Sequence, residues 1–298
     1  SRIGLSWDDA RIVSAHGKNC NLVSEIHTNK KVFAILGKGD SVAELAGKLA
    51  SYGMGEVLLY VGESLSYENE KIFSAKASEL TEYQGDPLSV LCAVNPSACE
   101  QPATHGLADE EFIRGKAPMT KTEVRTVSLG KLKLQEDSVC YDIGSGTGSV
   151  AVEIAKRSGQ IQVFAIEKKP LALELIQKNI EKFALPNIQV IAGEAPDCLK
   201  TEERSEHPTH AFIGGSSGRL KEILDVLYEK NHAMRIVINC ISLETIRELT
   251  LLETDSRITG LEIIQVQVSR AKTVGGYHLM QGENPIYICS FDFTGDVC

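Results

Sequence analysis

The chain has 298 residues, 43% of them hydrophobic and 24% charged, which is typical of a folded globular protein and excludes a disordered one. Its formal net charge of −9 argues against a protein that binds nucleic acid by neutralising phosphates. We find no signal peptide and no apolar run of the roughly 18 to 20 residues that cross a membrane, so we expect a cytoplasmic protein, long enough for two domains.

The first hundred residues predict a small α/β domain. Ser41 and Glu44 have the spacing of a capping box and predict a helix over residues 42–52. An aperiodic stretch over 98–105 indicates a linker, and the first domain is therefore expected to cover 1–97. Short apolar runs bounded by glycine or polar residues are typical of buried strands, and they cover 32–36, 57–61 and 88–94.

From residue 106 onward, strands and helices alternate, which predicts a mostly parallel seven-stranded sheet in a second domain over 106–298. No helix separates the last two strands, so we expect a hairpin that closes the sheet with one antiparallel member. The predicted strands are 139–142, 161–166, 188–192, 210–214, 235–240, 261–269 and 285–293. The predicted helices are about 147–157, 170–183, 219–229 and 243–252.

A glycine-rich loop, Asp142-Ile143-Gly144-Ser145-Gly146-Thr147-Gly148, joins the first of these strands to a helix. Glycine lets the backbone approach a ligand and adopt positive φ, and a helix N-terminus offers free N–H groups to a carboxylate. A nicotinamide-binding loop would carry glycine where Ser149 stands. Glu167 ends the second strand, where an acidic residue can bind ribose hydroxyls. The alternative is a purely structural turn between strand and helix.

This spacing resembles motif one of the class I, Rossmann-like methyltransferases, which implies S-adenosyl-L-methionine as the cofactor. Methyl transfer from an activated sulfonium depends mainly on positioning, which agrees with the lack of a recognisable acid–base set. Thr120 and Glu123 can also form a capping box, and the turn at 193–196 can be structural. The resemblance implies that the donor contacts Thr120, Gly144, Ser145, Gly146, Thr147, Gly148, Glu167 and Ala195.

Two segments narrow the resemblance to precorrin methyltransferases that act on carbon 15 and decarboxylate their substrate. They are the Pro-Met-Thr-Lys-Thr-Glu-Val-Arg stretch of 118–125 and the Gly-Gly-Ser of 214–216, and the resemblance runs from about 106 to 293. It implies methylation of carbon 15 of a precorrin tetrapyrrole, with loss of the carboxyl group of its ring-C acetate arm, in cobalamin synthesis. Whether the substrate contains cobalt is left open.

The first domain resembles the C-terminal half of a carbon-5 tetrapyrrole methylase, in Trp7-Asp8-Asp9-Ala10 and in 61–67. The N-terminal half of such a domain, with its own glycine-rich loop, does not precede it here. The chain begins at Ser1 without a methionine, so we expect the natural protein to begin further upstream. Carbon-5 methylation by this chain is left open.

A precorrin carries many carboxylates, so the resemblance implies a site with lysine and arginine. Arg114 is a further candidate, and for each basic residue the alternative is a solvated surface charge. His278 can exchange a proton near the macrocycle, although a loop histidine is often structural; the catalytic proton-transfer residue stays unknown. The predicted substrate-binding residues are Lys116, Lys121, Arg125, Arg270, Lys272 and His278.

The eight cysteines contain no C-x-x-C pair and no close spacing with histidine, so we expect no metal site. Cys140 and Cys240 lie in apolar runs, as buried free thiols do in a reducing compartment. Relatives of the second domain commonly form tetramers, which implies a homo-oligomer. One alternative is another class I methyltransferase, for instance one acting on tRNA, against which the acidic charge argues. In another, the first domain serves only as an interaction module.

Overall fold

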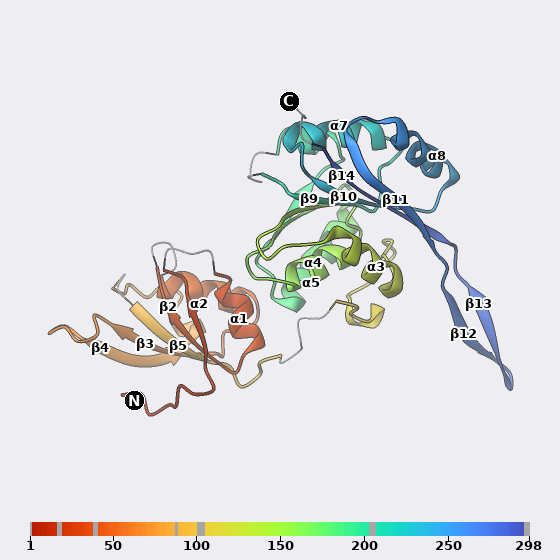
Figure 1. The fold of residues 1–298 in the computed structure, drawn as a ribbon. Helices are drawn as coiled ribbons and strands as arrows, with labels where there is room; N and C mark the ends of the chain where they lie inside the picture. Colours follow the sequence, from red (N-terminus) through yellow and green to blue (C-terminus); the bar gives the residue numbers. More distant parts are fainter. Residues whose placement is uncertain are drawn as a thin grey trace. The chain divides into compact units, whose positions relative to one another are not determined.

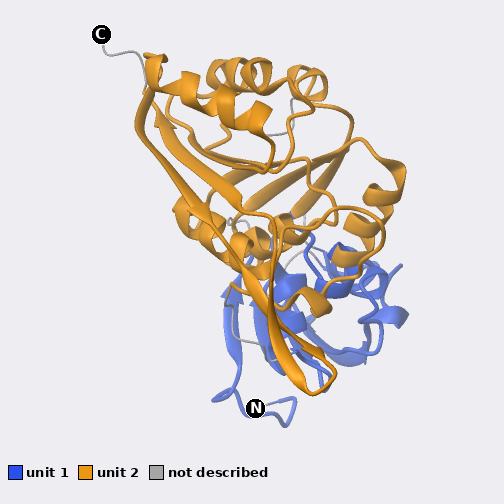
Figure 2. Cartoon of the chain, turned by 90° about the vertical axis from the view of Figure 1, so that its right-hand side faces the viewer, with its two compact units in different colours: residues 1–103, 180–187 blue, residues 104–179, 188–298 orange. Residues whose placement is uncertain are grey.

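A computed structural model describes residues 2–16, 20–37, 41–86, 89–99, 105–202 and 207–294. The chain divides into two compact units, shown in blue and orange in Figure 2. Unit 1 contains residues 1–103 and 180–187, and unit 2 contains residues 104–179 and 188–298. Of the predicted linker 98–105, residues 100–104 lie outside the described part of the chain.

Unit 1 is built on a five-stranded mixed sheet with the order β1-β2-β5-β3-β4. The predicted capping box is confirmed, because Ser41 Oγ accepts the Glu44 N–H at 3.2 Å and Glu44 Oε2 accepts the Ser41 N–H at 2.8 Å. The strands are β1 (Arg11–Ser14), β2 (Lys31–Ile35), β3 (Leu58–Glu63), β4 (Lys71–Lys76) and β5 (Ser89–Val94). The helices are α1 (Leu22–Thr28), α2 (Val42–Ser51) and the 3-10 turn η1 (Ala77–Glu79).

Unit 2 contains the predicted seven-stranded sheet, with the order β11-β14-β10-β9-β6-β7-β8. Strand β14 runs antiparallel to both of its neighbours, so the prediction of one antiparallel member is confirmed. The strands are β6 (Val139–Ile143), β7 (Gln162–Glu167), β8 (Ile188–Ala192), β9 (His210–Ile213), β10 (Arg235–Cys240), β11 (Ile258–Val266) and β14 (Ile286–Phe293). The mostly parallel sheet is the one expected from the alternation of strands and helices, and the fold is the Rossmann-like one that the resemblance implied.

The helices of unit 2 follow the predicted pattern, with α3 before the glycine loop and the short α6 after it in addition to the four predicted ranges. They are α3 (Thr122–Leu132), α4 (Ser149–Lys156), α5 (Pro170–Phe183), α6 (Asp197–Lys200), α7 (Leu220–Lys230) and α8 (Leu243–Leu251), with 3-10 turns η2 (Asp109–Glu111) and η3 (Leu252–Thr254). Apolar side chains of the central strands are fully buried, among them Tyr141, Phe164 and Phe212. No helix among the described residues is long and apolar enough to cross a membrane.

The connection between the last two predicted strands differs from the expectation. It folds into a second hairpin of β12 (Ser269–Val274) and β13 (Tyr277–Gly282), which extends away from the sheet in Figure 1. Gly275, with φ of 61°, lies in its two-residue turn, where a left-handed residue is favoured. Every residue of β12 and β13 is exposed.

Helix α3 begins differently from the prediction that Thr120 caps it. Its N-cap residue is Lys121, whose side chain makes no capping bond. Instead, Asp109 Oδ1 accepts the N–H of Thr122 at 3.1 Å. The capping interpretation of Thr120 is therefore wrong, because a carboxylate from the preceding turn serves that N–H group.

Candidate functional site

The loops that follow β6, β7, β8 and β9 meet at the carboxyl edge of the sheet, as expected for parallel strands. They enclose a first cavity of about 180 Å³. It is lined by Gly144 and Gly146 of the glycine loop and by Glu167, Gly193, Ala195 and Gly214 from the other loops. This edge therefore gathers residues that are far apart in the sequence into one site.

The glycines of the loop are required by its backbone. Gly144, Gly146 and Gly148 have φ of 74°, 59° and 79°, a region that side chains disfavour. A Cβ on Gly144 would lie 2.9 Å from the N atom of Gly215, and a Cβ on Gly146 would collide with the carbonyl oxygen of Pro118. The loop thus allows backbone segments to approach more closely than other residues would permit.

Glu167 is held at the end of β7 by backbone donors. Its Oε2 accepts the N–H of Gly146 at 3.0 Å, and its Oε1 accepts the N–H groups of Lys168 and Lys169, each at 2.9 Å. An ionised carboxylate has about four acceptor positions, so Oε2 retains capacity for a hydroxyl donor from the cavity. The position suits the ribose of a nucleoside.

Asp142, near the end of β6, is completely buried and holds the glycine loop through hydrogen bonds to its Oδ2 atom. Its Oδ2 accepts the Ser145 hydroxyl at 2.5 Å and the Ala151 N–H at 3.1 Å. Burial raises the pKa of Asp142 to about 6, against the opposing effect of these bonds. Among the described residues, neither Asp142 Oδ1 nor the buried Thr147 Oγ1 has a hydrogen-bond partner.

A second cavity of about 340 Å³ adjoins the first and shares Pro118, Gly144 and Gly214 with it. Thr120 and Ser145, both predicted donor contacts, line this second cavity. Thr147 and Gly148 line neither cavity and are buried. Other lining residues are Met119, Lys121, Val124, Asn239, Cys240, Ile241, Val266, Val268, Glu283, Asn284 and Ile286. The two cavities thus have the arrangement needed by a donor and an acceptor.

The predicted substrate-binding residues lie in different places. Lys121 lines the second cavity and approaches Asp109 Oδ2 with its Nζ at 3.4 Å. Lys116 lines a separate cavity next to α5 that also includes Pro118. Arg270 pairs with Glu123 at 2.6 Å and with Glu283 at 2.9 Å.

Two further predicted substrate-binding residues lie on the projecting hairpin (Figure 1), Lys272 on β12 and His278 on β13. Both are exposed, and neither lines the first or the second cavity.

The prediction for Arg125 needs correction. Its side chain is 0% exposed and lies inside unit 2. Its donors are used by the carbonyl oxygens of Leu107 and Thr120, by Thr122 Oγ1 and by the carboxylates of Asp109 and Glu153. A guanidinium has five N–H groups, so none is left for a substrate carboxylate. Arg125 is a structural residue of the site.

Sequence reasoning missed Asn239, near the end of β10 in the wall of the second cavity. Ser128 Oγ bonds its Oδ1 at 3.0 Å, and its Nδ2 has no partner among the described residues. Asn239 could have been identified from the sequence, because it is a single polar residue near the end of the apolar run of β10. The neighbouring Cys240 is not a nucleophile at neutral pH, because burial raises its pKa to about 11.

A polar bridge at the rim of the first cavity was also not predicted. Lys168 Nζ lies 2.5 Å from Glu194 Oε1 and 3.0 Å from Ser217 Oγ. The three residues come from the loops after β7, β8 and β9. No sequence pattern connects such separate loops, because the bridge exists only once the sheet has formed.

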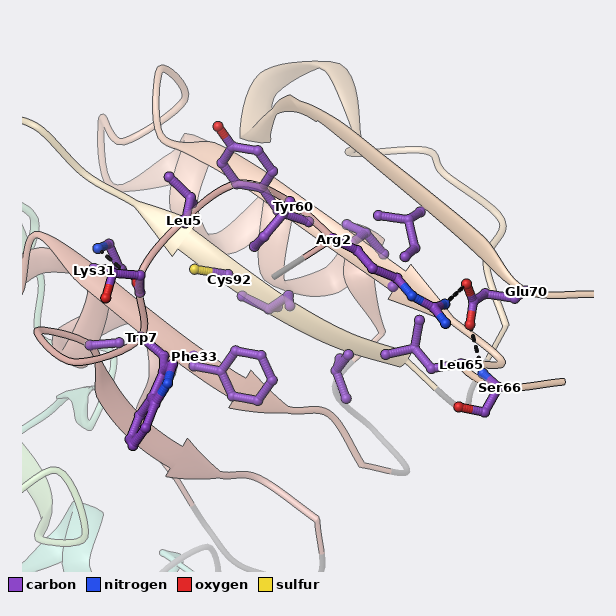
Figure 3. Close-up of a pocket in the computed structure, with 18 residues that line it drawn as sticks. Arg2, Leu5, Trp7, Lys31, Phe33, Tyr60, Leu65, Ser66, Glu70 and Cys92 are labelled. Carbon is purple, nitrogen blue, oxygen red and sulfur yellow. Dashed lines mark hydrogen bonds and ion pairs between the residues drawn. The ribbon is translucent and has the colours of Figure 1, made fainter.

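Unit 1 has a cavity of its own, of about 470 Å³, against the strands β2, β3 and β5. Figure 3 shows Phe33, Tyr60 and Cys92 on this face, with Arg2 directed to Glu70. The walls are mainly apolar, and burial raises the pKa of the Cys92 thiol. Within the described residues, no group of His, Cys, Asp and Glu could hold a metal ion.

Comparison with known proteins relates the second unit to one family. The model of the precorrin methyltransferase domain matches residues 111–292, which include the glycine loop and the residues that line the first and second cavities. A probable cobalt-precorrin-6B C(15)-methyltransferase (decarboxylating) of Sulfolobus acidocaldarius is 42% identical over 188 residues. These residues are 61% of this chain and 95% of that protein.

Two further similarities extend this result. A precorrin-6Y C(5,15)-methyltransferase (decarboxylating) of a Sinorhizobium species is 30% identical over 280 residues, which are 93% of this chain and 66% of that protein. The crystal structure of a precorrin-6y C5,15-methyltransferase from Geobacter metallireducens matches with a TM-score of 0.59 and 33% identity, over 65% of this chain and 100% of that one. With a Rossmann-like sheet, a glycine loop and the matching domain model, the chain belongs to the precorrin methyltransferase family.

Proposed function

We propose that this chain methylates carbon 15 of a precorrin with S-adenosyl-L-methionine and decarboxylates the ring-C acetate arm of the same substrate. The observation that carries the proposal is the shared wall of the two cavities, formed by Pro118, Gly144 and Gly214. A nucleoside-binding cavity beside a larger acceptor cavity places two ligands in contact. The names of the relatives support the acceptor, because the Sulfolobus and Sinorhizobium proteins are both decarboxylating precorrin methyltransferases.

The residues of the first cavity fit S-adenosylmethionine. Glu167 offers an acceptor to the ribose hydroxyls, and the positive φ of Gly144 and Gly146 opens the backbone next to it. The N-cap residue of α4 is Gly148, which has no capping side chain, and the backbone of the preceding loop at Gly144 and Gly146 lines the cavity and can approach the carboxylate of a ligand. Ala195 and Gly193 form the opposite wall, where an adenine can pack. When bound, this group supplies an activated methyl.

The second cavity is proposed to hold the macrocycle edge that reacts. Lys121 places a positive charge in the wall, which attracts a substrate carboxylate. The amide of Asn239 is fixed by Ser128 and can orient a polar group of the substrate. When the carbon–carbon bond to the acetate carboxyl breaks, the electron pair passes into the conjugated ring. The chain then has to position groups rather than supply a strong acid or base.

The proposal includes an assignment of the first domain, residues 1–97, to the C-terminal part of a carbon-5 tetrapyrrole methylase. The similarity to the Sinorhizobium enzyme supports it, since it covers 93% of this chain. We also propose a cytoplasmic location. None of the described cysteines forms a disulfide bond, as is usual in a reducing compartment.

We further propose that the chain is a homo-oligomer in which a second copy covers the β12–β13 hairpin. Val274, Tyr277, Leu279 and Met280 are 50%, 76%, 56% and 68% exposed on it. A two-stranded hairpin is marginally stable in water, and a cluster of exposed apolar side chains is typical of an interface. Burial against another copy would stabilise both strands.

The decisive experiment incubates the purified chain with methyl-labelled S-adenosylmethionine and either a carbon-15-unmethylated precorrin or bulk tRNA. We expect label in the tetrapyrrole, release of one carbon dioxide for each methyl transferred, and no label in tRNA. Parallel reactions with the cobalt-containing and the cobalt-free precorrin define the substrate. Label in tRNA with none in the tetrapyrrole would refute the proposed function.

A further inference from the structure

Residues 106–121 lie between the linker and α3 and form the common wall of the two cavities at Pro118. Apart from the 3-10 turn η2, this segment has no regular structure. Yet the carbonyl oxygen of Pro118 lies against Gly146, and Met119, Thr120 and Lys121 line the second cavity. Because no backbone ladder holds the segment, its position depends on side chains that bind it from elsewhere.

Arg125 binds both ends of this segment. Its Nη1 donates to the carbonyl oxygen of Thr120 at 2.6 Å, and its Nη2 donates to that of Leu107. The guanidinium carbon also lies 4.7 Å from the centre of the Phe112 ring, which places a buried side chain of the segment against it. One fully buried cation therefore fixes the start, the middle and the end of the segment.

Glu153 connects this arrangement to the helix that follows the glycine loop. The side chain lies on α4, is 1% exposed and accepts Nε of Arg125. Its two oxygens also accept the N–H groups of Gly106 at 2.8 Å and Leu107 at 3.1 Å. The segment is thus attached to the helix that directly follows the glycine loop, and Gly144 and Gly146 of that loop line the first cavity.

Asn179 of α5 provides a second, independent attachment. Its Oδ1 accepts the N–H of Ile113 at 2.8 Å, and its Nδ2 donates to the carbonyl oxygens of Ile113 at 3.0 Å and Thr147 at 2.9 Å. The amide is completely buried. It therefore joins the middle of the segment directly to the glycine loop.

The free-energy cost of burying the charges of Arg125 and Glu153 indicates that they have a role besides stability. Removing two charges from water costs several kcal/mol for each ion, and a well-packed apolar pair is often as stable as a buried ion pair. Stability alone therefore does not explain Arg125 and Glu153. What an apolar pair cannot provide is a fixed direction for the carbonyl oxygens of Leu107 and Thr120.

We propose that Arg125, Glu153 and Asn179 are positioning residues for methyl transfer, which hold Pro118 to Lys121 as a rigid wall between the donor and the acceptor. This inference rests on the proposed function for its chemistry, but the attachment itself can be measured without substrate. A displacement of about 1 Å in such a wall can lower a rate about 100-fold while the ligands still bind. The effect is therefore expected in kcat more than in KM.

The main variant is the double substitution Arg125→Met with Glu153→Met, made in the full chain, because it removes both charges together and retains apolar packing. We expect its unfolding midpoint to fall, because backbone groups of Gly106, Leu107 and Thr120 lose their side-chain partners, while the chain stays folded at the assay temperature. We expect kcat to fall about 10- to 100-fold, with the KM for the precorrin within about threefold. Asn179→Ala should show the same pattern through the other attachment.

The rate of proteolysis of the ligand-free protein shows directly whether the segment 106–121 stays attached. Trypsin can cleave after the exposed Arg114 and Lys116 once the segment leaves its place. We expect cleavage there to become at least tenfold faster in both variants. The matched control is Lys131→Met, which removes a cation of the same helix that pairs with Glu262 at the surface. It should change neither the cleavage rate nor kcat, because exposed ion pairs contribute little.

Unchanged cleavage and unchanged kcat in the double variant would overturn the proposal, and so would a loss of kcat that merely follows the loss of folded protein. A chain that does not methylate the precorrin at all would refute the proposed function. In that case the trypsin rate and the calorimetric affinity for S-adenosylmethionine still decide whether these residues hold the segment against the donor cavity.

Discussion

The carboxylate of Glu167 accepts the backbone N–H of Gly146 at 3.0 Å, so one bond joins the end of β7 to the glycine loop after β6. The two most important features of the sequence therefore act as one unit. Glu167 both fixes the loop and presents an acceptor to the first cavity. A change at this position affects the shape of the cavity and its chemistry together.

We predict that Glu167→Gln weakens the binding of S-adenosylmethionine about 10- to 100-fold. Glutamine offers one acceptor oxygen and directs an NH2 group at backbone donors, and a hydrogen bond to a charged group contributes about 1.5–3 kcal/mol. Isothermal titration calorimetry gives the affinity. Glu136→Gln, at an exposed position before β6, is the control and should leave it unchanged. If the unsubstituted chain, Glu167→Gln and Glu136→Gln all bound S-adenosylmethionine with the same affinity, Glu167 would not belong to the donor site.

Gly146→Ala is expected to abolish detectable methyl transfer. The new Cβ would collide with the carbonyl oxygen of Pro118, and φ of 59° is itself unfavourable for alanine. We expect a loss of about 1–3 kcal/mol in the free energy of unfolding, measured by urea denaturation.

The control for this substitution is Gly130→Ala, at an exposed site within α3 with nothing within 4 Å of the added Cβ. It should stabilise the chain by about 0.5–1 kcal/mol, because alanine favours a helix. If Gly146→Ala retained full activity, the close approach of Pro118 would have no functional importance.

The buried Asp142 predicts a distinctive pH dependence of stability. Burial raises its pKa to about 6 from an ordinary value of 3.8, so the folded chain binds this proton more tightly than the unfolded chain. The resulting stabilisation is fully present below about pH 4 and is lost as the pH rises through 6. Asp142→Asn should therefore increase the free energy of unfolding, relative to the original chain, more at pH 8 than at pH 4.

The expected difference between those two pH values is on the order of 3 kcal/mol, from the linkage between pKa and stability. Urea denaturation of both proteins at each pH measures it, and comparing the two proteins cancels the other carboxyl groups. A difference that does not change with pH would show that Asp142 is ionised as readily in the folded state as in the unfolded one.

Substitution of Tyr277 and Leu279 together by serine is predicted to reduce the proposed homo-oligomer to smaller species. Both side chains are exposed on β13 and lie on the same face of the hairpin as each other. Light scattering after size-exclusion chromatography measures the mass. Leu171→Ser, a change at an exposed leucine of α5, is the control and should leave the mass unaltered. A mass equal to that of the original chain would show that the hairpin is not the interface.

Local patterns explain why the glycine loop and Glu167 could be predicted. The glycines that adopt positive φ and the end of the buried strand can both be recognised from residues that are neighbours in the sequence. Arg125 was misinterpreted because its basic character was considered without its place on the helix. It precedes Leu129 by four residues and Leu132 by seven, and all three are buried. That spacing places it on the apolar face of α3.

Other features depend on contacts that no local pattern contains. Asp109 was not expected to serve the first N–H of α3, since it lies thirteen positions before Thr122 in the sequence. The β12–β13 hairpin, by contrast, carries a two-glycine turn that could have been used as a signal. Tertiary position, rather than residue type, decided the case of Asp109.

Pro118 belongs to the wall of both cavities, and this has a thermodynamic consequence. A ligand that shifts the proline in one cavity changes the free energy of binding in the other. Linkage then requires the effect to be reciprocal, so that donor and acceptor alter each other's affinity by the same factor. The demethylated donor would act on the affinity for the methylated precorrin through that same residue.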